Sequence, residues 1–406
     1  MMLANIRDNI NFTNVVNYFF ITYITLLFWL LHTNQSSSQT AATLFLLFAP
    51  FAVLLVKGTE VIKYRPLMIT IALVILFVIY NFLVLTQHKF SQLSLASYRA
   101  LFFWLLFPIA TLLLWWVKPS RQWVFIVFAC AAIFSLSPVI RDYMNGRVRG
   151  ASSGHPIFWG NIALCSGVIA FALRKSIAEK RWTNYLGYIA LTCGLIASFW
   201  SQTRGGWISI PVSLLILVSL KSISKVQAGA IILLLIAATF SFDTIENRIA
   251  RTISKINIFN AEVKLDASTQ VRLDMFQASF EIFKENPLFG NGFASYKASS
   301  KELVKQGKEP SWVSHFEQPH NEYLNTLVSS GITGLAMLIA ILTSILYLLF
   351  KLPKKSPYKI AGYLLISQYL IFSMSEIFFS TKLTIVYFCI AAALIIYAGL
   401  KEDEHA

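Results

Sequence analysis

The chain has 406 residues, of which 56% are hydrophobic and only 13% charged, with a mean hydropathy of +0.63. This composition excludes an ordinary water-soluble domain and is typical of an integral membrane protein. The net charge of +15 would suggest a nucleic-acid partner in a soluble protein, but basic cytoplasmic loops explain it in a membrane protein, so we expect no nucleic acid.

Apolar runs bounded by polar or charged residues recur along nearly the whole chain. The twelve candidate membrane spans are residues 14–31, 41–56, 66–86, 98–116, 121–140, 156–173, 184–201, 206–220, 226–242, 322–350, 359–379 and 383–400. They predict an all-α polytopic membrane protein with about twelve transmembrane helices and one large, partly helical outer loop. We expect residues 1–406 to form a single integral membrane domain.

The distribution of lysine and arginine predicts which loops face the cytoplasm. With the N-terminus inside, the inner segments hold 17 basic residues, whereas the short outer loops hold seven. Both termini are therefore predicted to be cytoplasmic. The four cysteines lie inside apolar runs, where a thiol behaves as a small hydrophobic group, so they imply no disulfide or metal site.

Residues 243–321 form the longest polar stretch and are predicted to be a loop insert on the outer face. Apolar residues at helical spacing predict one helix over 269–285, with Val271, Met275, Ala278 and Ile282 on one stripe, and an amphipathic helix over 243–257. Such helices lie on a membrane surface or cover a cavity. The alternative is a packed extramembrane subdomain without chemistry.

Arg204 is the clearest outer arginine, because almost no loop separates the two apolar runs that flank it. A charge at that depth costs a few kcal/mol and usually marks a substrate path or a paired site. Gly205 and Gly206 allow close backbone approach, and their amides can donate to an anion. The alternative is an interfacial arginine that binds lipid phosphates.

Other outer arginines fit the same anionic ligand. Arg141, Arg147 and Arg149 lie in one short hairpin, and their planar guanidinium groups suit a phosphorylated ligand, although lipid headgroups explain them equally well. Arg272, on the predicted 269–285 helix, is a further candidate, with a solvated helix face as its alternative.

His320 stands where the outer insert ends and an apolar run begins. Histidine changes its charge near neutral pH, which suits a general base. Asn321 and Glu322 are predicted to orient it, and a structural imidazole is the alternative. Glu376 lies toward the outer end of the 359–379 run, where a lone carboxylate predicts a functional group paired with an outer arginine, or a structural ion pair.

Two motif absences in the sequence limit the chemistry. No Asp-x-Asp pair occurs on the predicted outer side, so the usual carboxylate anchor for Mg²⁺ or Mn²⁺ is missing. No P-loop or dinucleotide fingerprint occurs either. We therefore expect metal-independent chemistry without a cofactor, with energy supplied by the substrate.

Three segments in order carry a family resemblance: residues 201–206, the block from Arg272 through 286–292, and residues 319–323 followed by Gly331 and Gly334. On these segments the chain resembles the O-antigen ligase and polymerase superfamily of integral membrane glycosyltransferases, over roughly residues 190–345. The ligase branch is similar in its span number and its single late periplasmic loop.

The resemblance implies a bacterial inner-membrane enzyme of lipopolysaccharide biosynthesis with a periplasmic site. Its expected donor is an undecaprenyl-pyrophosphate-linked glycan, its acceptor is lipid A–core, membrane lipids surround it, and the reaction inverts the anomeric centre. The catalytic positions carried over are Arg204, Arg272, His320 and Glu376. The substrate-binding candidates are Arg147, Arg149, Asn321 and Gly205.

Three alternatives remain open. An O-antigen polymerase usually has a second large periplasmic loop, which the short hairpin at residues 141–155 argues against. Protein O-oligosaccharyltransferases of the same superfamily usually have a longer C-terminal portion. A lipid or polysaccharide transporter is the alternative of another class, but transporters tend to show repeats and midplane ionisable groups, whereas these candidates gather at the outer face.

Overall fold

The computed structural model describes residues 12–55, 61, 63–87, 100–147, 154–177, 181–240 and 267–403. Within these ranges the chain is helical and forms no strand. The predicted helix over 243–257 lies outside the described residues. The elements are α2 (Phe12–Thr33), α3 (Gln35–Leu55), α5 (Arg65–Gln87), η2 (Phe103–Leu105), α7 (Leu106–Val117), α8 (Arg121–Phe134), α9 (Leu136–Met144), α10 (Pro156–Leu173), α11 (Arg181–Trp200), α12 (Arg204–Trp207), α13 (Ser209–Ser219), α14 (Lys225–Phe240), α16 (Ala267–Glu285), α17 (Tyr296–Lys305), η4 (Ser311–His315), α18 (Glu322–Lys351), α19 (Pro357–Phe372) and α20 (Lys382–Asp403).

Within the described residues the predicted apolar runs fall on helices, except that the 359–379 run extends past the end of α19 at Phe372. In the described part of the chain, six helical segments are long and apolar enough to cross a membrane. They are Arg65–Thr86, Ala100–Val117, Arg121–Met144, Pro156–Leu173, Glu322–Lys351 and Lys382–Glu402. The all-α, multi-pass character is therefore confirmed, and the number of twelve spans stays a prediction.

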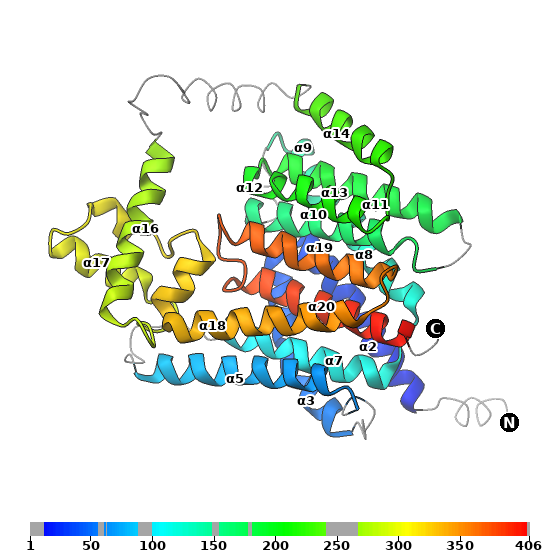
Figure 1. Cartoon of the computed structure of the whole chain (residues 1–406), viewed down its shortest axis with the longest axis horizontal. Helices are drawn as coiled ribbons and strands as arrows, with labels where there is room; N and C mark the ends of the chain where they lie inside the picture. The colour runs from blue at the N-terminus through cyan, green and yellow to red at the C-terminus, as the bar shows by residue number, and fades with distance from the viewer. Residues whose placement is uncertain are drawn as a thin grey trace.

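The helices form a bundle whose two ends carry different parts of the chain (Figure 1). Helices α16 and α17 of the insert lie at one end of the bundle, together with α12 and the turn between α19 and α20. The start of α2 and the end of α20 lie at the opposite end. Which end of the bundle faces the cytoplasm stays a prediction.

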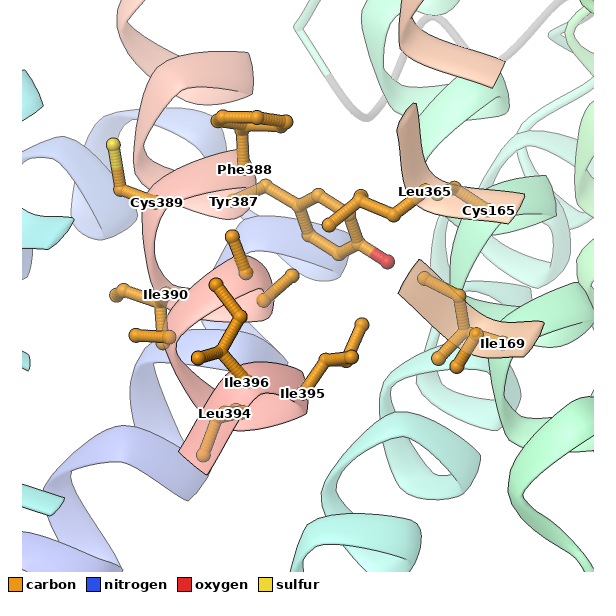
Figure 2. Close-up of a cluster of buried hydrophobic side chains, with 14 of the residues drawn as sticks. Cys165, Ile169, Leu365, Tyr387, Phe388, Cys389, Ile390, Leu394, Ile395 and Ile396 are labelled. Carbon is orange, nitrogen blue, oxygen red and sulfur yellow. The ribbon is translucent and has the colours of Figure 1, made fainter. Parts of the chain in front are cut away.

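Helix α20 lies in the middle of the bundle, and the whole of its most apolar window is buried. A helix that is apolar on all sides is stable in such a central position. Figure 2 shows Tyr387 and Ile395 of α20 beside Cys165 and Ile169 of α10 and Leu365 of α19. These contacts fix the helices that carry the two ends of the α19–α20 turn.

A short polar chain crosses this apolar interior. The Tyr387 hydroxyl and the Ser166 hydroxyl lie 2.8 Å apart, and His32 Nε2 lies 2.9 Å from Ser166 Oγ. His32 Nδ1 also lies 2.7 Å from the Phe28 carbonyl oxygen. The sequence attached no role to His32; the structure makes it a buried imidazole that links α2, α10 and α20, and whose hydrogen bonds offset the cost of burying it.

Helices α10 and α11 pack closely through glycines. A Cβ atom on Gly194 would lie 2.6 Å from the Ala163 carbonyl oxygen, and one on Gly167 would lie 2.8 Å from the Ala190 carbonyl oxygen. Small residues allow such close approach of two helix backbones inside a membrane. The packing fixes the end of α11, from which the chain continues to Arg204.

The predicted helix over 269–285 is confirmed as α16. Its stripe of Met275, Ala278 and Ile282 is buried, with Val271 partly buried beside it. These side chains pack against residues of α17, η4 and α18, namely Tyr296, Leu303, Val313 and Val328. The described part of the insert therefore has a small apolar core of its own that reaches the start of α18.

The insert is joined to α18 at a kink in that helix. Gly331 has φ 64° and ψ −168°, a conformation that is essentially restricted to glycine. The amide of Ile332 donates to the Pro287 carbonyl at 2.9 Å, and the amide of Asn291 donates to the Val328 carbonyl at 2.8 Å. The segment 286–292 thus satisfies backbone groups that the kink releases.

This joint tolerates no side chain at Gly331, because a Cβ there would collide with the Leu288 carbonyl group. We expect Gly331→Ala to destabilise the purified protein by more than about 4 kcal/mol. Gly307 is the matched control: it has φ +71° but open space around it, so Gly307→Ala should cost only about 1–2 kcal/mol. Thermal unfolding of both variants in lipid nanodiscs measures the two losses of stability. Equal losses would contradict the requirement for glycine at the joint between the insert and α18.

Glu309 lies buried in the insert between α17 and η4. Burial raises the pKa of its carboxyl above the ordinary value of 4.5, and the negative charges of Asp274 and Glu281 on α16 raise it further. Oε1 has no hydrogen-bond partner among the described residues. The folded state therefore favours the protonated carboxyl.

Stability linked to Glu309 should be fully present below pH 4.5, its ordinary value, and should be lost as the pH rises through the raised value. We therefore expect Glu309→Gln to raise the unfolding temperature at pH 7 and to change it little at pH 4. Unfolding scans across this pH range check the sign. A variant less stable than wild type at pH 7 would contradict it.

Candidate active site

The His320 imidazole and the Glu376 carboxylate form a hydrogen-bonded contact at the insert end of the bundle. His320 Nδ1 lies 3.0 Å from Oε1 and 2.9 Å from Oε2 of Glu376. The Glu376 side chain is 1% exposed, whereas that of His320 is 26% exposed. An ionised carboxylate only accepts hydrogen bonds, so Nδ1 is the donor. The other ring nitrogen, Nε2, is then the atom that can accept a proton from a ligand.

The backbone at His320 is held in an unusual conformation. Its φ is 51°, in the left-handed region that non-glycine residues rarely adopt. Directly after it, the Asn321 side chain caps α18 by accepting from the Leu324 amide at 3.1 Å, and its Nδ2 donates to the Met374 carbonyl at 3.2 Å. These two bonds engage both ends of the Asn321 amide, so in the structure it positions His320 against the α19–α20 turn.

Glu322 was expected to orient His320, and the structure corrects this. The Glu322 carboxylate is 1% exposed and accepts from the Phe379 amide and the Ser380 hydroxyl, each at 2.6 Å. Its own amide donates to the Ser373 carbonyl at 2.9 Å. Glu322 therefore holds both ends of the turn that carries Glu376, and Glu376 is the residue that orients the imidazole.

Glu376 differs from its predicted setting in two ways. The predicted run ended at residue 379, but α19 ends at Phe372, so Glu376 lies in the turn between α19 and α20. An arginine was its expected partner, and the structure gives it His320 instead. The turn at the end of the bundle places the carboxylate beside the imidazole.

Arg204 lies on a tight elbow between two helices. Helix α11 ends at Trp200, Gln202 adopts φ 54°, and α12 begins at Arg204, which is exposed. A Cβ atom on Gly205 would lie only 2.5 Å from the Ser375 hydroxyl oxygen. The elbow therefore abuts the turn that carries Glu376, so the structure brings the Arg204 segment and the His320 contact together.

The elbow rests on Asn161, a residue that the sequence analysis did not select. A Cβ on Gly206 would collide with Asn161 Oδ1. Asn161 is fully buried on α10, and neither polar atom of its amide has a hydrogen-bond partner among the described residues. The signal in the sequence was an asparagine inside an apolar run, which alone does not separate a functional amide from a structural one.

Arg272 lies on α16, and the apolar core of the insert connects this helix to the end of the bundle that carries His320. It is half-buried on α16, beside the buried stripe. The preceding residue, Val271, and Phe316 both pack against that core, and the Phe316 ring lies edge-on to the His320 ring at 5.8 Å between centroids. Arg272 itself makes no hydrogen bond or ion pair with another described residue, so its part in the site remains a prediction.

The structure gives less information about the arginines of the predicted outer hairpin, which are Arg141, Arg147 and Arg149. Arg147 is exposed after the turn that follows α9, and among the described residues no hydrogen bond or ion pair joins its side chain to the His320 contact. Arg149 lies outside the described residues. The Arg141 guanidinium donates to the Thr33 carbonyl at 2.6 Å, which satisfies the end of α2, so Arg141 has a structural role.

The Glu322 carboxylate should contribute strongly to stability. In Glu322→Gln the new NH₂ group would face donors, which leaves at least one buried group unsatisfied and should cost about 1–3 kcal/mol. Glu317 is the matched control, because its side chain is 75% exposed in a surface pair with Lys297, and Glu317→Gln should change stability by less than about 0.5 kcal/mol. The unfolding temperatures of the two variants measure these losses of stability. Equal unfolding temperatures would show that the contacts of Glu322 with the α19–α20 turn, the Glu322 clamp, contribute little to stability.

Comparison with known proteins shows which family this part of the chain resembles. Residues 189–339 match the family model described as O-antigen ligase, which confirms the resemblance. The match includes the Arg204 elbow, the insert joint and His320, while Glu376 lies beyond it. An uncharacterized protein of Haemophilus influenzae (strain ATCC 51907 / DSM 11121 / KW20 / Rd) is 27% identical over 251 residues, which is 59% of this chain. The match spans 61% of that relative's length.

Proposed function

Because residues 189–339 match the O-antigen ligase family, we propose that the protein is a membrane glycosyltransferase that joins a glycan to lipid A–core. Its donor is a glycan on undecaprenyl pyrophosphate, and the reaction takes place at the periplasmic face of a bacterial inner membrane. Both termini face the cytoplasm, and residues 243–321 form the periplasmic loop insert. The observation that carries the proposal is the contact of His320 with Glu376 beside the Arg204 elbow.

In this reaction a sugar hydroxyl of the acceptor attacks the anomeric carbon of the donor glycan. The new glycosidic C–O bond forms as the C–O bond to pyrophosphate breaks, with inversion at that carbon. The hydroxyl proton passes to Nε2 of His320, which acts as the general base. Glu376 accepts from Nδ1–H, keeps Nε2 free to take the proton, and stabilises the imidazolium that results.

The departing undecaprenyl pyrophosphate carries the negative charge of the broken bond. Guanidinium groups of Arg204 and Arg272 bind phosphate through paired hydrogen bonds and stabilise that charge. Gly205, a substrate-binding candidate, lets the elbow approach the turn that carries Glu376, so that Arg204 and His320 act on one ligand. Arg147 and Arg149 bind a further anionic part of the donor or lipid headgroups at the periplasmic surface.

Single-turnover transfer in lipid nanodiscs tests the base. With undecaprenyl-pyrophosphate-linked glycan and rough lipopolysaccharide, His320→Ala should lose transfer by about 10²–10⁴-fold and should still bind the donor. His315, exposed on η4, is the matched histidine, and His315→Ala should transfer normally. Normal turnover per folded His320→Ala molecule would refute the base assignment.

The acceptor distinguishes the alternatives in the same assay. Extension of a second lipid-linked glycan would instead identify a polymerase, and glycan attachment to a protein would identify a protein O-oligosaccharyltransferase. Movement of the lipid-linked glycan across the bilayer without any transfer would identify a transporter.

Metal dependence is a separate expectation. Arginines neutralise the pyrophosphate in this mechanism, and the predicted outer side has no Asp-x-Asp pair to hold a divalent cation. We therefore expect the transfer rate to change less than about twofold in excess EDTA. If the transfer rate is lost in EDTA and returns only with Mg²⁺ or Mn²⁺, a metal ion neutralises the pyrophosphate, which would contradict this expectation.

A further inference from the structure

Two adjacent apolar side chains, Leu288 and Phe289, are exposed where the insert joins α18; we call them the insert tip. They are 58% and 56% exposed, although the backbone that carries them is firmly held. The Thr333 amide donates to the Leu288 carbonyl at 3.3 Å, and the Tyr80 hydroxyl of α5 donates to the Phe289 carbonyl at 3.5 Å. The insert tip is therefore presented outward at a fixed place beside α5 and α18.

The insert tip lies at one end of the membrane-crossing part of α18. That helix is kinked at Gly331, and the residues from Ile332 to Lys351 follow the kink. At 1.5 Å per residue they rise about 30 Å, which is the thickness of the hydrocarbon core of a bilayer. The charged Lys351 belongs at one edge of that core, so Ile332 lies close to the other edge. The tip lies at the same level, because the Ile332 amide donates to the Pro287 carbonyl.

The apolar outer faces of α5 and α18 continue onto the insert tip. Both helices are long and apolar enough to cross a membrane. Leu76, Ile79 and Leu83 share one face of α5, and about half of each side chain is exposed, as is that of Ile332 on α18. Isolated exposed apolar residues are common on proteins, whereas a continuous apolar surface marks a contact with a membrane or a partner. The tip, bonded to both helices, prolongs a surface that faces lipid.

We propose that the insert tip penetrates the edge of the bilayer and contacts lipid acyl chains there. The continuity with the outer faces of α5 and α18 favours lipid over a second copy of the chain. This contact anchors the insert to the membrane at its joint with α18. The helical segment Glu322–Ser330 connects the tip to His320 over about 15 Å, so the anchor also restrains where the His320 contact stands relative to the bilayer.

The test measures the surroundings of a nitroxide spin label at Phe289→Cys, in phosphatidylglycerol nanodiscs that hold one copy of the full chain. The background is Cys130→Ala, because the other three cysteines are buried. Collisions with O₂, which enters hydrocarbon, are compared with collisions with a water-soluble nickel chelate. Ile339→Cys on α18 is the lipid reference, since Ile339 is exposed within the apolar span. Ala298→Cys is the water reference, on the exposed side of α17 far from the bundle (Figure 1).

The ratio of O₂ to nickel collisions at Phe289→Cys should exceed that at Ala298→Cys about fivefold or more and should approach that at Ile339→Cys. A ratio equal to that at Ala298→Cys would overturn the anchor. Protection from nickel that appears only in vesicles crowded with protein, and not in single-copy nanodiscs, would show that a second copy covers the tip and would overturn it too.

Two features of the design keep the outcomes distinct. Unfolding temperatures show whether Phe289→Cys folds, and Leu288→Cys gives the same comparison if it does not. The measurement needs a chain that spans a membrane but no glycan transfer. Absence of transfer by the wild-type protein would therefore overturn the proposed function and leave the result for the insert tip unchanged.

Discussion

The buried Glu376 carboxylate is the constraint on which the site depends. A carboxylate that is 1% exposed is costly to desolvate unless a charged or hydrogen-bonding partner accompanies it. His320 is that partner, and its own position depends on the Asn321 cap at the start of α18. Glu322, at the start of the same helix, binds the far end of this turn through Phe379 and Ser380. These contacts together hold the imidazole against the α19–α20 turn.

The family-like segments divide into two kinds once their contacts are known. Residues 201–206 and 319–323 bring chemically active side chains to one end of the bundle. The Asn286–Gly292 block and Gly331 instead form a backbone joint between the insert and α18. The joint fixes where the insert sits, and therefore where α16 and its Arg272 approach the end of the bundle that carries His320.

Much of the fold followed from hydrophobic pattern alone. The helix over 269–285 was predictable because four apolar residues share one face, and His320 and Arg204 stood out as polar groups beside apolar runs. The pairing of His320 with Glu376 was not predictable, because 56 residues separate them and only the turn after α19 brings them together. Asn161, His32 and the clamp role of Glu322 were missed for the same reason: their significance lies in contacts between distant helices.

The tautomer of His320 is the most direct test of this account. In ¹⁵N-histidine-labelled protein in nanodiscs, with the His320 signals assigned from His320→Gln, the neutral ring should carry its proton on Nδ1 and leave Nε2 unprotonated. Glu376→Gln should remove the downfield shift of the Nδ1 proton, while Glu317→Gln should leave it in place. A neutral His320 that carries its proton on Nε2 in the wild-type protein would contradict the assignment of this imidazole as the base.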